Sequence, residues 1–324
     1  MKTTYLAVDV GGTQLRAAAY FEGESTPAII KRIPTRSRGG ATGSSRGSTA
    51  VERLQGLITE VLEATSAAGG KVQSIAVAVP GPTDPEAGVI YTAPNIPGWD
   101  NLPLKHLLEE RFHLPVALGN DANLAALGEW KFGAGRGARN MLFMTISTGI
   151  GAGVIMDGRL LLGAHGLATE LGHMVILPDG PLCSCGKRGH LEALASGTSI
   201  ARYVTEQIQQ GAVSSLAAIE KISAKEISQA AAQGDALALA ALEQAGRYLG
   251  MALGNYLHAF NPSVIVLGGG VTRSGAPLLK PLQATLEEQV MTPVYLQDLE
   301  ITTAALGDDA GLMGALALAQ TTGG

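Results

Sequence analysis

The stretch from Tyr5 to Tyr20, YLAVDVGGTQLRAAAY, decides the fold class. Two apolar runs, 4–10 and 15–20, flank a turn that contains two adjacent glycines. Apolar runs separated by such a turn predict a strand, a tight turn and a second strand. The same pattern returns at 141–156, MLFMTISTGIGAGVIM, in the second half of the chain. This repeat predicts two similar halves that face one cleft.

Helical and extended patterns alternate along the rest of the chain. Apolar residues spaced three and four apart predict helices, and short apolar runs that end in glycine or proline predict strands. The helices are expected at 49–67, 103–112, 192–209, 236–260 and 309–319, and the strands between them at 75–79, 116–118 and 264–267. Strands that alternate with helices predict an α/β protein. A chain of 324 residues has room for two domains.

The composition excludes several classes of protein. Hydrophobic residues make up 46% of the chain and charged residues 16%, which is typical of a folded protein with a substantial core. The net charge is −5 and no basic run stands out, so we expect no nucleic-acid partner and no membrane partner. No apolar stretch is long enough to span a bilayer. The two cysteines exclude a disulfide framework, and a reducing cytoplasm is the expected compartment.

Three glycine segments follow predicted strands and are candidates for binding phosphate. They are Gly11-Gly12-Thr13, Thr148-Gly149 and Gly268-Gly269-Gly270. Backbone N–H groups with no Cβ beside them can approach phosphate oxygens, and the threonines add hydroxyl donors. We expect Asp9, at the end of the first strand, to hold a hydrated Mg²⁺ that bridges phosphate oxygens. The alternative is that tight hairpins use glycine only for its positive φ.

Four potential metal ligands, which include every cysteine of the chain, lie within 18 residues of one another. They are His173, Cys183, Cys185 and His190, and the loop between them is rich in glycine and proline. Thiolate and imidazole are the ligands of structural, tetrahedral Zn²⁺. The pattern therefore predicts a structural zinc site, and the alternative is two buried thiols with incidental histidines.

Together these segments resemble the ROK family of repressors, open reading frames and sugar kinases. The family's signature is matched at Gly149, Gly151, Gly153, Gly163, Gly172 and His173, its first phosphate segment at Asp9–Thr13, and its nucleotide-base segment at Val266–Gly270. The resemblance covers residues 5 to about 318. It implies the two-domain actin-like ATPase fold of sugar kinases, with an interdomain cleft. The expected domains are 1–119 plus 309–324, and 120–308.

Asp121 follows a predicted strand and is the candidate general base. A hydroxyl that attacks a phosphate gains from a carboxylate that accepts its proton and aligns it. From the residues alone, an aspartate at the start of a helix is most often an N-cap, which is the alternative. The resemblance implies the catalytic role, because the family's catalytic aspartate falls on the pair Asn120-Asp121.

The resemblance also implies a set of sugar contacts. They are Gly81, Asn95, Asn120, Asp121, Glu170, His173 and Glu192. Asn95 lies in the loop 93–99, which resembles the glucose-recognition loop of family glucokinases, and its alternative is an ordinary Asx turn. For Glu170 the alternative is a solvated carboxylate.

The family usually has a cysteine where this chain has His190. The expected zinc ligands are therefore two histidines and two cysteines, in a loop that would hold Glu192 in place.

The resemblance implies a kinase that uses ATP and Mg²⁺ to phosphorylate glucose at the 6-hydroxyl, giving glucose 6-phosphate. Kinases for fructose, mannose, allose, N-acetylglucosamine or N-acetylmannosamine, and a polyphosphate-dependent glucokinase, are the open alternatives. The family also leads us to expect a homo-oligomer, either a dimer or a tetramer.

Two function classes other than a kinase share the implied fold. ROK repressors carry a helix-turn-helix module ahead of the first phosphate segment, and only eight residues precede Asp9, so a repressor is not expected. The other class is an ATPase or scaffold that binds no sugar. Asn95, Asp121, Glu170 and Glu192 together argue against that class, because they form a polar set suited to sugar hydroxyls.

Overall fold

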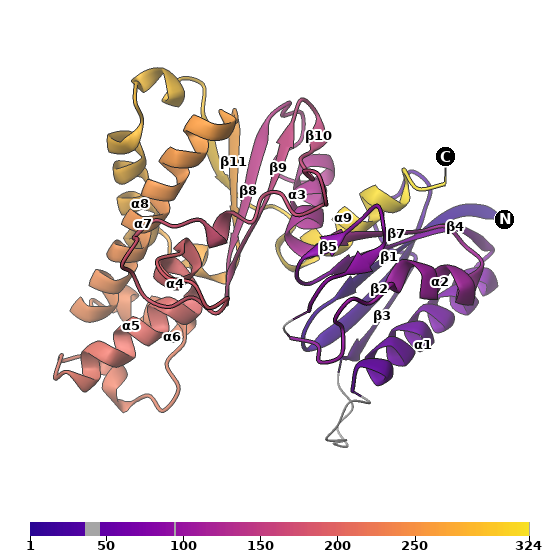
Figure 1. Cartoon of the computed structure of the whole chain (residues 1–324), viewed down its shortest axis with the longest axis horizontal. Helices are drawn as coiled ribbons and strands as arrows, with labels where there is room; N and C mark the ends of the chain where they lie inside the picture. The colour runs from indigo at the N-terminus through magenta and orange to yellow at the C-terminus, as the bar shows by residue number, and fades with distance from the viewer. Residues whose placement is uncertain (36–45, 94, 324) are drawn as a thin grey trace.

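The computed structural model describes residues 1–35, 46–93 and 95–323, and it contains two five-stranded sheets in two lobes (Figure 1). The first sheet contains β1 (Lys2–Val10), β2 (Gln14–Phe21), β3 (Ile29–Pro34), β4 (Gly70–Val79) and β7 (Val116–Asn120), in the order β3-β2-β1-β4-β7. β1, β2 and β3 are antiparallel, whereas β4 and β7 extend the sheet in parallel with β1. A small hairpin of β5 (Thr83–Asp84) and β6 (Val89–Ile90) follows β4.

The second sheet repeats the topology of the first. It contains β8 (Met141–Ile146), β9 (Ile150–Met156), β10 (Arg159–Leu160), β11 (Val264–Gly268) and β12 (Glu300–Thr303), in the order β10-β9-β8-β11-β12. Again the first three strands are antiparallel and the last two are parallel to β8. The predicted repeat is therefore confirmed, and both glycine turns join the first two strands of a sheet.

One face of each sheet is covered by helices of the same half of the chain. α1 (Arg46–Ala67) and α2 (Leu104–Phe112) pack on the first sheet through a core that includes Leu54, Ile58 and Leu108. The second sheet is covered by α4 (Leu191–Ala195), α5 (Gly197–Gln209), α6 (Ala224–Ala232), α7 (Ala236–Phe260) and α8 (Ala276–Gln289). The 3₁₀ helices are Leu171–His173, Ser215–Ala218, Gly270–Ser274, Pro293–Leu296 and Gly307–Asp309. Within the described residues, no helix combines the length and the apolar character that a membrane crossing requires.

The prediction of one helix over 192–209 is wrong, because the chain turns at Ser196. The side chain of Ser196 accepts the N–H of Ser199, 3.2 Å away, and so begins α5 as its N-cap. Apolar spacing continues across this break, which is why the sequence pattern does not reveal it. The long helix predicted at 236–260 and the last helix predicted at 309–319 are confirmed as α7 and α9 (Ala310–Ala319).

Two helices, α3 (Asp121–Phe132) and α9, lie between the two sheets (Figure 1). Leu124 of α3 packs with α9 against the first sheet, while Ala125 and Ala126 face the core of the second sheet. The two helices cross in very close contact. A Cβ on Gly314 would lie 1.6 Å from the carbonyl oxygen of Leu124, and one on Gly128 would lie 2.4 Å from that of Ala310. α3 leads from the first sheet into the second, and α9 follows the last strand of the second sheet and packs on the first. The two chain segments that pass between the sheets therefore contact each other at this crossing.

Glu129 is fully buried beside this crossing and ties the two connecting segments together. Its carboxylate accepts the backbone N–H of Ala134 at 2.8 Å, just after α3. It also accepts the N–H groups of Ala305 at 3.1 Å and Leu306 at 2.8 Å, in the segment between β12 and α9. Ala305 is exposed and Ala134 and Leu306 are half-buried, so it is the carboxylate that lies away from water. The three N–H groups supply the hydrogen bonds that a buried carboxylate requires.

We expect Glu129→Ala to destabilise the folded protein by about 2–4 kcal/mol, because three N–H groups lose their hydrogen bonds to a buried carboxylate. Urea unfolding followed by circular dichroism measures the change. The matched control is Glu52→Ala, which removes an exposed glutamate of α1 and should change the free energy of unfolding by less than about 0.5 kcal/mol. Equal stability of the two variants would contradict this role of Glu129.

Candidate active site and metal cluster

A cleft of about 1080 Å³ lies between the two sheets and brings most of the predicted site residues together. The first sheet and its connections contribute Asp9, Arg16, Gly81, Asn120 and Asp121 to its lining. The second half of the chain contributes Thr148, Gly149, Glu170, His173, Cys185, Glu192 and Gly268–Gly270. Among the described residues, the lining does not include Gly11, Gly12, Thr13 or Asn95. Pro94, in the predicted recognition loop, lies outside the described residues.

The first glycine turn is held from one side by Thr35. The hydroxyl of Thr35 donates to the carbonyl oxygen of Gly11 at 2.6 Å, and its N–H donates to the carbonyl oxygen of Thr13 at 2.9 Å. From another side Asn95 packs on the turn, because a Cβ on Gly12 would lie 3.0 Å from the Cβ of Asn95. The turn and the predicted sugar loop are therefore neighbours.

Positive φ explains only one glycine of the three predicted phosphate segments. Gly269 has a φ of 89°, and a Cβ there would lie 2.2 Å from the carbonyl oxygen of Ile146. The other glycines of these segments do not have a φ in the left-handed region; they are Gly11, Gly12, Gly149, Gly268 and Gly270. Gly270 lines the cleft, and a Cβ added to it would meet no atom within 4 Å. The alternative that glycine serves only for its positive φ is therefore wrong for these five positions.

Asp9 is paired with Arg16, a cleft residue that the sequence pattern does not single out. The two residues lie directly opposite each other in the antiparallel pair β1–β2, and Nη2 of Arg16 lies 2.6 Å from Oδ2 of Asp9. Arg16 also reaches Asp309 through Nη1, at 2.9 Å. This chain of charges joins the first glycine hairpin to the segment that leads into α9.

Asn120, and not Asp121, is the N-cap of α3. Its side-chain oxygen accepts the N–H groups of Ala122 at 3.0 Å and Asn123 at 3.2 Å, and its amide donates to the carbonyl oxygen of Gly81 at 3.1 Å. The capping alternative for Asp121 is therefore wrong, because the preceding residue fills that position. Asp121 begins the helix and its side chain is exposed to the cleft.

The environment of the cleft makes Asp121 a stronger base than an ordinary aspartate. The surrounding protein displaces bulk water and raises the pKa of Asp121 to about 6. The N–H of Ala122, which donates to the carboxylate at 2.8 Å, opposes this shift, and the charges of Asp9 and Glu170 add to it. A carboxylate with such a pKa is ionised at pH 7 and is still able to accept a proton during a reaction.

Glu170 is the N-cap of the 3₁₀ turn Leu171–His173, and His173 is the last residue of that turn. Residues three apart on such a turn project to the same side, and both of these side chains line the cleft. Burial raises the pKa of Glu170, and the neighbouring His173 opposes the shift. Thr169, just before this turn, has a φ of 70°, which is unusual for a β-branched residue, and its hydroxyl donates to Oδ1 of Asn123 at 2.9 Å. This bond connects the turn to the helix that carries Asp121.

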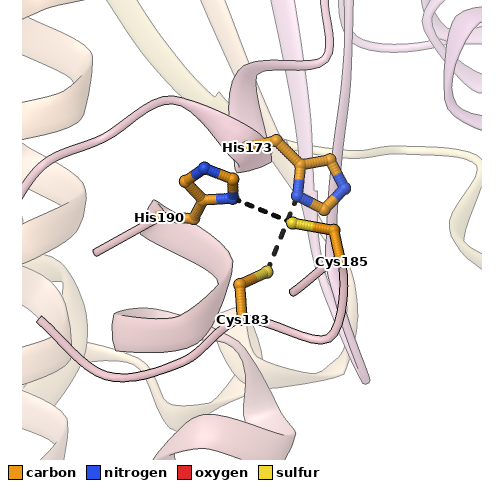
Figure 2. Close-up of side chains that lie close together, drawn as sticks. All are labelled: His173, Cys183, Cys185 and His190. Atoms are coloured by element: carbon orange, nitrogen blue, oxygen red, sulfur yellow. Dashed lines mark hydrogen bonds between the residues drawn. The ribbon is translucent and has the colours of Figure 1, made fainter. Parts of the chain in front are cut away.

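The four predicted metal ligands form one cluster (Figure 2). Their ligand atoms all lie within 4.8 Å of one another. Nδ1 of His173 lies 3.7 Å from Sγ of Cys183, and Nδ1 of His190 lies 3.3 Å from Sγ of Cys185. Ligands at ordinary zinc distances in a tetrahedron are about 3.6 Å apart, so the cluster has the size of a zinc site.

The ionisation of His190 also suits a metal ligand. Burial and the neighbouring His173 hold the pKa of His190 below its usual value, which favours the neutral imidazole that metals bind. His173 directs Nδ1 toward the cluster, as Figure 2 shows, and it also lines the cleft. Its ring meets that of His190 edge to face, with centroids 5.4 Å apart. The cluster and the cleft therefore share two residues, His173 and Cys185.

Comparison with known proteins identifies the family. A model of the ROK family matches residues 5–322. The chain belongs to the ROK family. A glucokinase of Halalkalibacterium halodurans is 39% identical to this ROK protein over 316 residues, which cover 96% of this chain and 93% of the relative.

Solved ROK structures share the fold of this chain. A ROK family glucokinase from Streptomyces griseus, in complex with glucose and AMPPNP, matches with a TM-score of 0.80 at 32% identity, over 98% of this chain and 99% of that one. A ROK family transcriptional regulator homologous to the E. coli MLC protein matches with a TM-score of 0.88 at 34% identity, over 99% of this chain and 78% of that one. The expected actin-like sugar kinase fold is confirmed. Since kinases and regulators share it, the functional argument depends on the residues of the cleft.

Proposed function

We propose that this ROK protein is a glucokinase, which transfers the γ-phosphoryl group of ATP to the 6-hydroxyl of glucose and releases glucose 6-phosphate and ADP. The observation that carries the proposal is the cleft, whose lining brings Asp121, with a pKa of about 6, together with Glu170, Glu192 and two glycine segments. The similarity to glucokinases over nearly the whole chain supports the same activity.

Asp121 is the proposed general base. It accepts the proton of the sugar 6-hydroxyl as that oxygen attacks the γ-phosphorus. The new O–P bond forms while the bond to the bridging oxygen of ADP breaks, and the proton remains on Asp121. Asn120 supports this role, because its hydrogen bonds to α3 and to Gly81 fix the backbone on which Asp121 lies.

The proposed sugar contacts surround this base. Glu170, His173 and Glu192 line the cleft on the side of the second sheet, and Gly81 and Asn120 line it on the side of the first. Carboxylates and imidazole accept or donate hydrogen bonds to several hydroxyls at once, which suits a polyol. Asn95 packs beside Gly12, and its contact with the sugar stays a prediction.

The proposed phosphate contacts come from both sheets. Thr148, Gly149 and Gly268–Gly270 line the cleft, and Gly11, Gly12 and Thr13 form the matching turn of the first sheet. Asp9 lines the cleft and is the proposed ligand of Mg²⁺, whose charge would neutralise the phosphates. Both Arg16 bonds to Asp9 reach Oδ2, so the carboxylate is shared between the arginine and this proposed role.

The metal proposed for His173, Cys183, Cys185 and His190 is a structural Zn²⁺. Two thiolates and two imidazoles that lie this close together fit the preference of zinc for four ligands, and four protein ligands leave no position for a substrate. The bound ion would hold the loop that connects the cluster to Glu192. Two free thiols in such a site fit the reducing cytoplasm expected from the sequence.

The proposed domains are 1–119 plus 309–324, and 120–308. The first range builds the first sheet, and α9 packs against it through Leu312 and Leu316.

The homo-oligomer also stays a proposal. Large apolar side chains are exposed along the metal loop, at Met174, Val175, Leu177 and Leu182, which is typical of a contact surface. Light scattering coupled to size exclusion measures the number of subunits.

A coupled assay over a panel of hexoses, with ATP or polyphosphate as donor, tests the proposed activity. We expect glucose with ATP to have the highest kcat/KM. The panel includes fructose, mannose, allose, N-acetylglucosamine and N-acetylmannosamine. A higher kcat/KM for another hexose, or for polyphosphate, would reassign the substrate or the donor, and the absence of turnover with every pair would remove the kinase proposal.

The raised pKa of Asp121 predicts the pH dependence of the reaction. Below pH about 6 the base is protonated, so we expect kcat/KM to fall about tenfold per pH unit. In the folded protein the protonated form is favoured, so the contribution of this group to stability is present below about pH 3.8 and is lost as the pH rises through about 6. Glu170→Gln removes a charge that helps to raise this pKa, so its kcat/KM midpoint should lie at a lower pH. The control is Asp157→Asn, which changes an exposed carboxylate outside the cleft lining and should leave the midpoint unchanged. A flat profile from pH 7 to pH 5 would contradict the assignment.

A further inference from the structure

The carboxylate of Glu192 joins the metal loop to the second glycine turn. Its Oε2 accepts the N–H of Ile150 at 3.0 Å, directly after Thr148-Gly149. Its Oε1 accepts the hydroxyl of Ser184 at 2.9 Å, and Ser184 lies between the two cysteines of the cluster. Glu192 therefore connects the loop proposed to bind zinc with the turn proposed to bind phosphate, one through each of its carboxylate oxygens.

Gly149 makes this connection possible by having no side chain. A Cβ on Gly149 would lie 2.5 Å from Oε2 of Glu192, and the backbone of Gly149 is not in the left-handed region. The turn itself is held by the hydroxyl of Thr198, which donates to the carbonyl oxygen of Thr148 at 2.8 Å. Close contact with Glu192 is therefore a physical reason for glycine here, separate from any contact with phosphate.

We propose that glucose and nucleotide bind cooperatively through the bond between Glu192 and Ile150, with Gly149 and Ser184 as positioning residues. The proposal rests on the proposed function, in which Glu192 contacts the sugar and the turn Thr148-Gly149 contacts phosphate. A sugar hydroxyl that donates to Glu192 fixes the carboxylate in one position, and the carboxylate in turn fixes the N–H of Ile150 and the turn. The nucleotide then meets an ordered turn, so less conformational entropy is lost when it binds. By linkage, the nucleotide strengthens sugar binding by the same factor.

The test is a pair of glycine substitutions on the nucleotide side of the cleft. Gly149→Ala places a methyl group against a flexible carboxylate, so Glu192 shifts away from Ile150 while the backbone keeps its conformation. We expect its Kd for glucose, measured by calorimetry without any nucleotide, to rise about tenfold, a value within the usual range of coupling between sites. Gly270→Ala is the matched control, because no atom lies within 4 Å of its added Cβ, and its Kd for glucose should equal that of the unchanged protein.

Coupling is measured from the Kd of AMPPNP with Mg²⁺, in the presence and absence of saturating glucose. We expect glucose to lower this Kd about 5–150-fold in the unchanged protein and to have little effect in Gly149→Ala. Ser184→Ala should reduce the factor by which glucose lowers the Kd of AMPPNP. Its zinc content, measured by elemental analysis, should stay the same. Undiminished coupling in both variants, or equal glucose affinity of Gly149→Ala and Gly270→Ala, would overturn the proposal. If the unchanged protein binds no glucose, the proposed function fails together with this proposal. If it binds glucose but shows no coupling to AMPPNP, only this proposal fails.

Discussion

Asp121→Ala is expected to lower kcat by about 10²–10⁴-fold, the usual contribution of a general base. Asp121 is exposed to the cleft and Asn120 caps α3, so the substitution removes the base without removing a helix cap. The folded state and the affinity for glucose should therefore remain. A coupled assay measures kcat, and titration calorimetry with glucose measures the affinity.

Two further variants make this test specific. Asp121→Asn keeps the size of the side chain and removes its basicity, so its loss of kcat should be as large as that of the alanine variant. Asp157→Ala removes an exposed aspartate that pairs with Arg139, and its turnover should match that of the unchanged protein. Near-normal turnover in Asp121→Asn would refute the assignment of the base.

Cys183→Ala is expected to remove the bound zinc and to lower stability and glucose affinity together. Cys183 is the buried thiol of the cluster, and loss of a metal site belongs to the few changes that lower the free energy of unfolding by more than about 3 kcal/mol. Glucose affinity falls because Sγ of Cys183 lies 3.6 Å from Oε1 of Glu192, in the loop that holds this carboxylate. Elemental analysis, thermal unfolding and calorimetry give the three readouts.

His190→Cys and Lys187→Ala are the controls for the cluster. The first restores the cysteine that the family usually has at this position, so zinc content and glucose affinity should persist. The second changes an exposed residue of the same loop that is not among the predicted ligands, and it should leave all three readouts unchanged. A protein purified without chelator that contains no zinc would remove the metal assignment, whatever the variants do.

The sheets can be predicted from sequence because their signals are local. Apolar runs and glycine turns lie within a few residues of one another, and they recur in both halves of the chain. The metal cluster can be predicted for the same reason, because its four ligands lie in one short loop. In both cases chain neighbours are also neighbours in space.

Contacts between distant segments cannot be predicted in this way. Arg16 reaches Asp309 across 293 positions, and only the register of β1 and β2, which sets Arg16 opposite Asp9, would draw attention to it. Glu129 resembles an ordinary polar helix residue until the fold places the N–H groups of residues 305 and 306 beside it. The sequence pattern places the cap of α3 one residue too late, because Asn120 and Asp121 are both good cap residues and only the geometry separates them.

The position of the sugar relative to Asp121 is best measured in a crystal grown with glucose and AMPPNP. The proposed mechanism predicts that the 6-hydroxyl oxygen lies about 2.6–3.2 Å from a carboxylate oxygen of Asp121, on the side that faces the γ-phosphate. Glu170, His173 and Glu192 should then contact the other hydroxyls. A structure in which glucose occupies the cleft with no oxygen within hydrogen-bond distance of Asp121 would contradict the proposed catalytic base.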